Sequence, residues 1–275
     1  MECPYKDLFI YYIQGCLKPE LELGLGDDFL GNWEEDGYSF LFFSRSAHKT
    51  VFDLVRTNPG LLLLLDNYIM PYTQWQQDHD QILDIGGFSV CAPWSDHETP
   101  PGKTRLWMDP GVVFGTGTHP TTRDCMLALE ILYRDEKPRR VLDLGTGTGL
   151  LALAVTALGA ESVLAVDLNP LAAKTTARNV ELNHMEDRIR TVRGSALDYV
   201  QEPADLVVAN IHFAVMKEMA SDPLFLRGKH FVLSGLLRSE IRDIKDAIKA
   251  LGAVVQQEWE QESTWFTIMG KGPAG

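Results

Sequence analysis

The sequence predicts an α/β protein in which a small α+β domain precedes a larger, doubly wound domain built on a mostly parallel sheet. Segments typical of strands and helices alternate from about residue 104 to the end of the chain. A glycine-rich turn separates the first clear strand of that region from the helix that follows it. The first 70 residues combine apolar runs typical of strands with one helical stretch. Strand–helix alternation of this kind places helices on both faces of a parallel sheet.

Residues 1–70 are expected to form the small α+β domain. Apolar runs at 8–13, 38–43 and 61–69 are typical of strands, and 47–56 has the pattern of a helix. These segments suggest a small sheet with a packed helix, a reduced ferredoxin-like unit. Residues 60–66 contain five consecutive leucines, a run far too short to span a bilayer, and are expected to form a buried strand.

The next stretch, 71–103, is rich in Pro, Gln, Asp and Trp and is expected to be an irregular linker. From residue 104 onward the elements can be given in order. Seven strands are expected, at 139–144, 162–166, 189–192, 205–209, 230–234, 254–258 and 264–269. Helices are expected at 123–133, 150–158, 170–183, 212–219 and 239–250. Asn169 and Pro170 suit the N-cap and first positions of the third helix.

A glycine-rich turn follows the strand at 139–144. Gly145, Gly147 and Gly149 alternate there, directly before a helix, where glycine permits a tight turn and close approach of the backbone to a ligand. Asp167 ends the second strand, and a carboxylate at that place can accept hydrogen bonds from both ribose hydroxyls of an adenosine. Alternatively, Asp167 could be a helix cap.

Two details distinguish this turn from a dinucleotide-binding turn. The spacing is GxGxG, and Asp143 lies two residues before the first glycine. A carboxylate there suits the cationic amino group of a methionyl moiety and would repel a pyrophosphate. The turn also lacks the GK[ST] ending of a P-loop. The expected ligand is therefore S-adenosyl-L-methionine, although Asp143 could instead cap a neighbouring turn.

Two further segments are expected to meet the cofactor. Asn210 ends the fourth strand, where it could orient an amine acceptor, hold the methionyl part of the cofactor, or simply cap the next helix. The loop at 108–122 is rich in Gly, Thr and Pro and is expected to fold over the cofactor, with the Phe114 ring and the hydroxyls of Thr118 and Thr122 as contacts. The alternative is an ordinary loop that ends in a threonine N-cap.

These motifs resemble a known family. Four segments carry the resemblance: Met108-Asp-Pro-Gly-Val-Val-Phe-Gly-Thr-Gly-Thr-His-Pro-Thr-Thr122, Val141-Leu-Asp-Leu-Gly-Thr-Gly-Thr-Gly149, Val207-Val-Ala-Asn-Ile211 and Leu233-Ser-Gly-Leu-Leu237. They closely resemble the bacterial PrmA family, whose members methylate ribosomal protein L-eleven on lysine side chains and the N-terminal amine. Trp75-Gln-Gln-Asp78 and Ala92-Pro-Trp94 also look like that family's linker, so the resemblance covers about residues 75–270.

The resemblance implies a Rossmann-like, seven-stranded methyltransferase domain over 104–275 and a substrate-recognition domain over 1–70. It places cofactor contacts at Thr122, Gly145, Asp167 and Asn210. The chain departs from the family at Thr146 and Thr148, where Cys and Ser are usual, and at His212-Phe213, where small apolar residues are usual. The first change leaves cofactor binding intact, whereas the second could reshape the acceptor pocket. The first 70 residues are also shorter than the family's recognition domain.

The composition of the chain limits the kinds of partner and ligand that are expected. The formal charge of −13 opposes a direct grip on RNA or DNA phosphates and would attract a basic protein partner, or it only aids solubility. The four cysteines form no CxxC pair and the seven histidines no HxxxH pair, so no metal site is expected. The N-terminus has no features of a signal peptide and no apolar run reaches 18 residues, so a cytoplasmic protein without a membrane segment is expected.

The predicted function is S-adenosylmethionine-dependent N-methylation of protein amines, with a ribosomal protein as the expected substrate. A small-molecule methyltransferase with the same catalytic domain and a non-catalytic cofactor-binding assembly factor are the alternatives. Methyl transfer from a sulfonium needs alignment rather than a metal. His119 and His212 are only candidates for a general base, because a lone histidine is more often a structural hydrogen-bonding residue.

Overall fold

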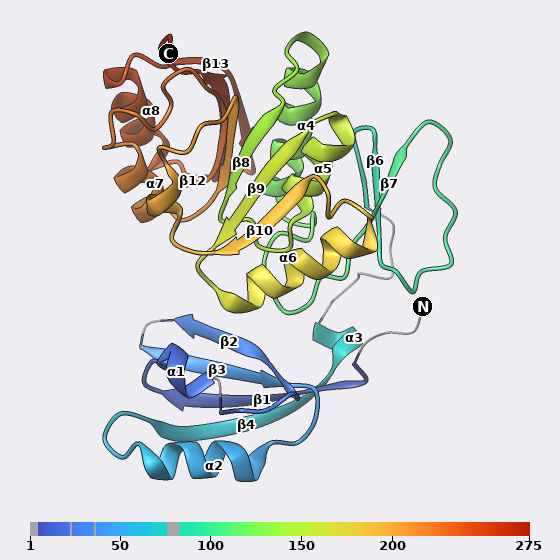
Figure 1. Ribbon diagram of the computed structural model, residues 1–275, viewed down its shortest axis with the longest axis vertical. Helices are drawn as coiled ribbons and strands as arrows, with labels where there is room; N and C mark the ends of the chain where they lie inside the picture. The colour runs from blue at the N-terminus through green and yellow to red at the C-terminus, as the bar shows by residue number, and fades with distance from the viewer. Residues whose placement is uncertain (1–4, 23, 36, 76–82) are drawn as a thin grey trace. The chain divides into compact units, whose positions relative to one another are not determined.

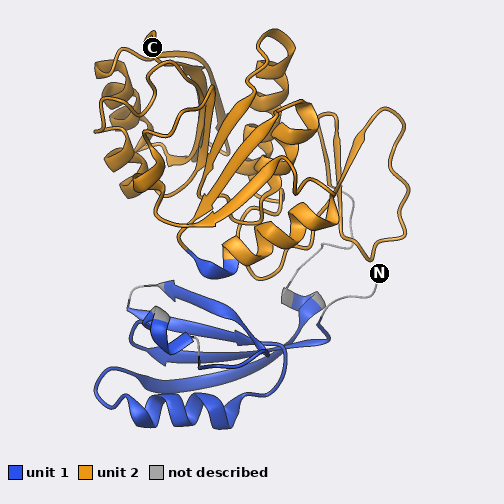
Figure 2. Ribbon diagram, viewed as in Figure 1, with its two compact units in different colours: residues 1–79, 169–171 blue, residues 80–168, 172–275 orange. Residues whose placement is uncertain are grey.

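The computed structural model describes residues 5–22, 24–35, 37–75 and 83–275. The chain divides into two compact units, which are described separately below (Figure 2). The N-terminal unit comprises residues 1–79 together with 169–171, and the C-terminal unit comprises 80–168 and 172–275. Within the described ranges, no helix combines the length and the apolar character needed to cross a bilayer.

The N-terminal unit is a four-stranded antiparallel sheet with one substantial helix (Figure 1). Its elements are β1 (Asp7–Gln14), α1 (Pro19–Glu22), β2 (Phe29–Glu35), β3 (Tyr38–Phe43), α2 (His48–Thr57), β4 (Leu63–Pro71) and α3 (Tyr72–Trp75). The strand order is β2-β3-β1-β4. This βαββαβ arrangement confirms the ferredoxin-like prediction, with the first helix reduced to four residues. Strand β2 was not predicted, because its sequence FLGNWEE contains no sustained apolar run.

One face of this sheet packs against α2, whose Val51 and Leu54 are buried with Tyr11, Ile13 and Leu41. The prediction of a buried strand across the five leucines is wrong for most of them. Leu62 is 5% exposed, but Leu61, Leu63 and Leu65 are 60%, 54% and 43% exposed. The physical reason is position: β4 pairs only with β1, so it is an edge strand, and seven of its nine residues are exposed.

The C-terminal unit is built on the predicted seven-stranded sheet. Its strands are β8 (Arg140–Leu144), β9 (Ser162–Asp167), β10 (Ile189–Arg193), β11 (Leu206–Asn210), β12 (His230–Leu237), β13 (Val254–Gln261) and β14 (Trp265–Lys271). The order is β10-β9-β8-β11-β12-β14-β13, in which only the pairs made by β14 are antiparallel. The strand order reverses beside β8, which is where an open sheet of this kind forms its ligand crevice.

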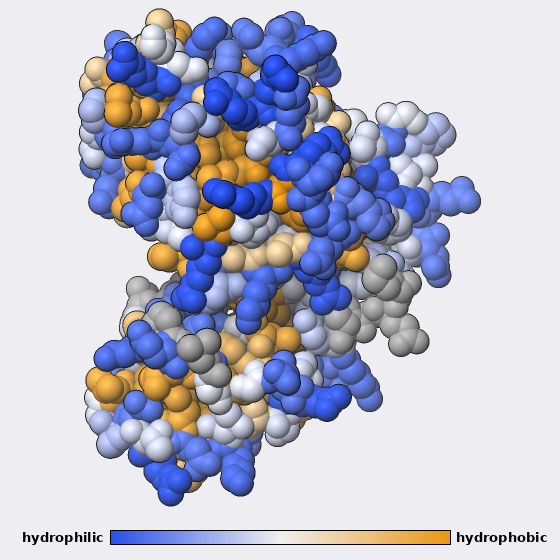
Figure 3. Space-filling view, viewed as in Figure 1, coloured by the Kyte–Doolittle hydropathy of each residue, from blue (hydrophilic) through white to orange (hydrophobic). Residues whose placement is uncertain are grey.

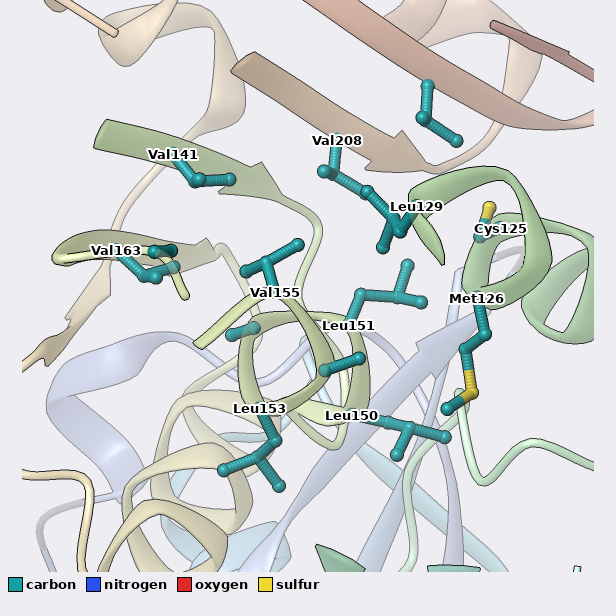
Figure 4. Packing of buried hydrophobic residues seen from close by; sticks show 14 of the residues in the cluster. Cys125, Met126, Leu129, Val141, Leu150, Leu151, Leu153, Val155, Val163 and Val208 are labelled. Carbon is teal, nitrogen blue, oxygen red and sulfur yellow. The ribbon is translucent and has the colours of Figure 1, made fainter. Parts of the chain in front are cut away.

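Helices cover both faces of this sheet, as the doubly wound prediction requires. They are α4 (Pro120–Asp135), α5 (Leu150–Leu158), α6 (Pro170–Leu182), α7 (Phe213–Met219) and α8 (Ile241–Ala250), with a 3-10 turn η1 (Ala196–Tyr199). On one face, Met126 and Leu129 of α4 and Val155 of α5 pack against Val141 and Val208 of the strands (Figure 4). On the other face, residues of η1, α7 and α8 pack over the alternate strand positions. Successive side chains of each strand point to opposite faces of the sheet, so alternate residues are buried in two separate cores.

The expected irregular linker at 71–103 contains regular structure. Strands β5 (Leu83–Ile85) and β6 (Phe88–Cys91) form a three-stranded sheet with β7 (Thr104–Trp107), in the order β5-β6-β7. Phe88 and Val90 are buried in the same core cluster as α4 and α5, so these strands belong to the C-terminal unit. Strands of three and four residues give too short a pattern to be predicted. Residues 76–78 of the linker motif lie outside the described residues.

Candidate cofactor and acceptor site

A pocket lies where the glycine-rich turn, the loop before α4 and the end of β11 meet. It is a partly open pocket of about 250 Å³, a volume that includes space open to solvent. Its lining residues are Phe114, Gly115, Thr122, Gly145, Thr146, Gly147, Leu150, Leu151 and Asn210. Five of the eight predicted site residues therefore come together here, from segments almost 100 residues apart in the sequence. The other three, Thr118, Asp143 and Asp167, do not line this pocket.

Direct hydrogen bonds join the glycine-rich turn to the loop before α4. Gly147 has φ = 58°, and a Cβ atom at this position would lie 2.4 Å from the backbone oxygen of Phe114. The Thr148 N–H donates to that same oxygen at 3.1 Å, and the Thr148 hydroxyl donates to the Gly115 oxygen at 2.6 Å. The close approach that requires glycine at 147 is therefore made by the backbone of Phe114. The sequence pattern predicts a close approach to a ligand at this position.

Asp167 lies at the end of β9 and supports the turn. Its Oδ2 accepts a 2.9 Å hydrogen bond from the Gly147 N–H. The helix α6 is capped by a different residue, because the Asn169 side chain accepts from the Leu171 N–H at 2.8 Å. The predicted N-cap at Asn169 and helix start at Pro170 are confirmed. The alternative in which Asp167 caps this helix has no support in these contacts.

Asp143 lies beneath the turn rather than in the pocket lining. Only 1% of its surface is exposed, and its Oδ2 accepts a 2.6 Å hydrogen bond from the Thr146 hydroxyl. Among the described residues, no hydrogen bond of ordinary geometry reaches its Oδ1. Burial raises the pKa of Asp143 to about 7, and the Thr146 hydrogen bond opposes that rise in part. A buried carboxylate that is hydrogen-bonded to Thr146, a residue of the pocket lining, suits a cationic ligand group nearby.

Asn210 ends β11 and faces the start of α4. Its Nδ2 donates to the hydroxyls of Thr121 at 3.1 Å and Thr122 at 3.3 Å. The N-cap position of α7 is occupied by His212, so the Asn210 amide is engaged in this cluster and not in capping that helix.

Thr118 is exposed, and its hydroxyl lies 2.9 Å from that of Thr116, away from the pocket lining. The N-cap of α4 is His119, whose Nδ1 accepts from the Thr121 N–H, so the loop does not end in a threonine cap. Burial lowers the pKa of His119, an effect that the charge of Glu262 opposes.

The departure at His212-Phe213 leaves the pocket open. His212 is exposed, and Phe213 packs against the core cluster that contains α7 and α8, with the Lys217 ammonium 5.2 Å from the centre of its ring. Neither residue lines the pocket.

Sequence reasoning missed several residues of the site. Leu150 and Leu151 looked like ordinary core residues of an apolar helix, yet both line the pocket. Thr122 was predicted as a contact and Thr121 was not, although the Thr121 hydroxyl contacts both His119 and Asn210. Trp265 lies 146 positions after His119 in the sequence, and its ring stacks edge-on against the His119 imidazole with centroids 4.8 Å apart. No local pattern in the sequence could have paired these two rings.

The chemistry of this site fits an adenosyl ligand with a methionyl group. Apolar walls from Phe114, Leu150 and Leu151 suit a flat aromatic base and its linker. Carboxylates at the ends of β8 and β9 suit an ammonium group and ribose hydroxyls. Among the described residues, no group of three or more His, Cys, Asp or Glu side chains is arranged to hold a metal ion.

Comparison with known proteins agrees with this geometry. Residues 72–273 match the family described as ribosomal protein L11 methyltransferase (PrmA). The ribosomal protein L11 methyltransferase of Geobacillus kaustophilus is 35% identical over 73% of this chain and 64% of its own length. That of Exiguobacterium sibiricum is 34% identical over 72% of this chain and 62% of its own length. The chain thus spans less than two thirds of the length of these relatives.

A solved structure is also similar. The ribosomal protein L11 methylase of Lactobacillus delbrueckii subsp. bulgaricus superposes with a TM-score of 0.62 and 26% identity, covering 70% of this chain and 99% of that one. The fold is therefore that of a Rossmann-like methyltransferase, as predicted. With a family match over most of its length and a pocket built from the family's motifs, this chain belongs to the ribosomal protein L11 methyltransferase (PrmA) family.

Proposed function

We propose that this chain is an S-adenosyl-L-methionine-dependent N-methyltransferase that modifies amines of a ribosomal protein, lysine side chains or the N-terminus. One observation carries the proposal: the loop before α4, the glycine-rich turn and Asn210 form a single pocket in a chain of this family. The name of its relatives suggests L11 as the substrate to test first.

The cofactor would occupy the crevice along the ends of β8, β9 and β11. Because Asp167 accepts a hydrogen bond from Gly147, which lines the pocket, the adenosine would extend toward that carboxylate. The methionyl amino group would lie near the Asp143–Thr146 pair. Gly145, Gly147 and Thr122 would line the middle of the ligand. Bound in this way, the sulfonium group supplies an electrophilic methyl.

The acceptor amine must arrive without its extra proton. A lysine side chain has an ordinary pKa of about 10.4, and transfer into an apolar, partly desolvated pocket lowers that value by disfavouring the ammonium. Phe114, Leu150 and Leu151 supply the apolar surface. Alignment of the amine with the methyl group would then account for much of the acceleration. Asn210 is the polar side chain of the pocket best placed to provide that alignment.

The N-terminal residues 1–70 would recognise the substrate, and the catalytic domain would comprise 104–275 together with β5 and β6. Apolar, orange surface breaks the polar covering of this unit (Figure 3). The exposed apolar side chains on and beside β4 are Leu61, Leu63, Leu65, Tyr68 and Ile69. Five exposed apolar side chains within the nine residues 61–69 make this segment the candidate interaction surface of the unit. The net charge of −13 favours a basic partner over direct contact with nucleic acid, and such a partner would be met in the cytoplasm.

Radiolabelled methyl transfer tests the proposal. The purified chain is incubated with labelled S-adenosylmethionine and, separately, with ribosomal protein L11, the remaining ribosomal proteins and a metabolite extract. Label on lysine or the N-terminal amine of a ribosomal protein is expected. The family match begins at residue 72 and leaves the N-terminal unit outside it, which favours a changed acceptor as the second candidate. Label only in the metabolite fraction would establish that candidate, and no label anywhere at saturating cofactor would leave a non-catalytic binding protein.

A further inference from the structure

A chain of hydrogen bonds connects the pocket to the start of α4. It runs from the Asn210 carboxamide to the Thr121 hydroxyl at 3.1 Å and from that hydroxyl to His119 Nδ1 at 2.7 Å. We propose that His119 and Thr121 are positioning residues that hold the Asn210 amide in one orientation, with its oxygen presented to the methyl acceptor. The catalytic part of this inference rests on the proposed function above, whereas the orientation itself can be measured without turnover.

The backbone fixes the tautomer of His119. The Thr121 N–H donates to His119 Nδ1 at 3.3 Å as part of the cap of α4. A backbone N–H can only donate, so Nδ1 must be unprotonated and the neutral ring carries its proton on Nε2. The same nitrogen lies 2.7 Å from the Thr121 hydroxyl, which must therefore donate to it.

The direction of that hydroxyl then fixes the amide. A threonine hydroxyl has one proton, and in Thr121 that proton is given to His119. Only its lone pairs remain for Asn210, so the group of Asn210 that faces Thr121 must be the NH₂ donor. The neighbouring Thr122 hydroxyl lies 3.3 Å from the same Nδ2 and can accept its second proton. Both protons of the amide nitrogen are thereby directed toward α4.

The amide oxygen is left on the other side of the group. No hydrogen bond from the described residues to Asn210 Oδ1 accompanies the two made by Nδ2. The space beside it is kept by Gly235, which has φ = 84° and whose Cβ, if present, would lie 3.0 Å from that oxygen and 2.9 Å from the Ile211 backbone oxygen. The Asn210 side-chain oxygen and the Ile211 backbone oxygen therefore lie close together, and Asn210 itself lines the pocket. An amine that donates N–H to such oxygens has its lone pair directed elsewhere and free to attack.

The surroundings of His119 favour the neutral ring that this scheme needs. Phe114 and Trp265 lie edge-on against the imidazole, with ring centroids 5.3 Å and 4.8 Å away. Burial lowers the pKa of His119 despite the charge of Glu262. With Nε2 protonated and the one available lone pair, on Nδ1, taken up by the Thr121 N–H and hydroxyl, the neutral ring has no free lone pair for an acceptor amine. The structure therefore assigns His119 to positioning and not to proton abstraction.

Substitutions at Thr121 test the catalytic part. Thr121→Val removes the hydroxyl at nearly constant shape, Thr121→Ser keeps it, and Thr191→Val is the control, because Thr191 lies on β10 and outside the pocket lining. Thr121→Val is expected to lower kcat for L11 methylation by roughly 10- to 100-fold, as misalignment does. KM for the cofactor should stay within about twofold, since ground-state binding is not altered. Thr121→Ser should recover most of the loss and Thr191→Val should show none. Equal kcat for Thr121→Val and Thr191→Val would overturn the proposal.

Imidazole ¹⁵N NMR tests the orientation independently of any substrate. Protein labelled at histidine nitrogen should show His119 as the neutral tautomer protonated at Nε2, and Thr121→Val should shift the side-chain amide resonances of Asn210. A His119 ring protonated at Nδ1 at neutral pH would refute the proposal, whether or not the enzyme turns over. If the expected tautomer is found but no amine is methylated, the proposed function fails and the orientation stands. His119→Asn, which retains a cap acceptor for Thr121, provides a second variant if Thr121→Val does not fold.

Discussion

The Thr146 hydroxyl donates a 2.6 Å hydrogen bond to Asp143, a carboxyl group that is 1% exposed beneath the glycine-rich turn. This contact gives a reason for a hydroxyl residue at the first position between the glycines. Thr148, at the second position, donates inward in the same way to the Gly115 backbone oxygen. Both hydroxyls stabilise the turn itself, one from the strand below and one from the loop opposite.

The pH dependence of stability should reveal Asp143. Its pKa is about 7 in the folded chain against an ordinary 3.8, so the unfolded state ionises first as the pH rises. The stability that the protonated carboxyl contributes is therefore complete below pH 4, falls between about pH 4 and 7, and is gone above pH 7. Asp143→Asn removes this term while keeping an acceptor for Thr146. Urea unfolding is expected to show the variant within about 1 kcal/mol of the wild type at pH 4 and more stable by on the order of 2–4 kcal/mol at pH 8.

The same variant should bind the cofactor more weakly. If the carboxylate faces the methionyl ammonium, its replacement by an amide removes a charged interaction of roughly 1–3 kcal/mol. Calorimetric titration with S-adenosylmethionine at pH 8 measures this loss. For the stability prediction, the difference in free energy of unfolding between the two proteins could instead stay constant from pH 4 to 8. That result would show that Asp143 is already ionised in the folded state at low pH, contrary to the expectation.

Gly147→Ala should loosen the connection between the turn and the loop. The added Cβ would lie 2.4 Å from the Phe114 oxygen, so the Thr148 hydrogen bond to that oxygen must lengthen or the loop must move. A loss of about 2–4 kcal/mol in the free energy of unfolding is expected, the sum of positive-φ strain and the contact. Gly102→Ala is the control, because Gly102 has φ = 82° with no atom within 4 Å of its Cβ position. Urea unfolding of both variants separates strain from collision, and equal losses would show that the Phe114 contact contributes nothing.

Asp167→Ala should reduce cofactor affinity by roughly 1–3 kcal/mol, the scale for a lost charged hydrogen-bonding group. Part of that loss would come through the turn, because Asp167 also accepts from the Gly147 N–H. Asp167→Asn keeps an oxygen for that N–H and removes only the charge, so its affinity should lie between those of the wild type and the alanine variant. Isothermal titration calorimetry compares the three, and an unchanged affinity in Asp167→Ala would remove this residue from the site.

Much of this arrangement could be predicted from the sequence because its causes are local. The strands of the large sheet are apolar runs of the right length, and the turn carries glycines where positive φ is needed. The pattern failed where the cause was a partner far away in the chain. Leu63 and Leu65 look like core residues, but the pairing of β4 with β1 alone leaves them uncovered. The Thr121–Asn210 contact joins residues 89 positions apart, so no spacing rule could indicate which of two adjacent threonines would make it.

Asn210→Ala should reduce turnover more than stability. The side chain lines the pocket and donates hydrogen bonds to the hydroxyls of Thr121 and Thr122. Without it, the Thr121 hydroxyl still has its hydrogen bond to His119. Loss of the amide is expected to lower kcat by about 100-fold and the free energy of unfolding by no more than about 1 kcal/mol. Single-turnover methylation and urea unfolding on the same preparation measure both. A matched, large loss of stability would instead identify Asn210 as a structural residue of this cluster.

The exposed leucines of β4 should affect substrate binding and leave chemistry unchanged. Leu63 and Leu65 are 54% and 43% exposed on an edge strand, where apolar contact with a protein substrate would be available. Replacing both with lysine would raise KM for L11 by roughly 10-fold or more, because an apolar contact is lost and positive charge faces a basic partner. The kcat value and the cofactor affinity should not change. Val254→Lys is the matched control, a 62% exposed apolar residue on β13 at the edge of the other sheet. If the double variant methylates L11 with unaltered KM, this strand is not the recognition surface, and a different face of the N-terminal unit must select the substrate.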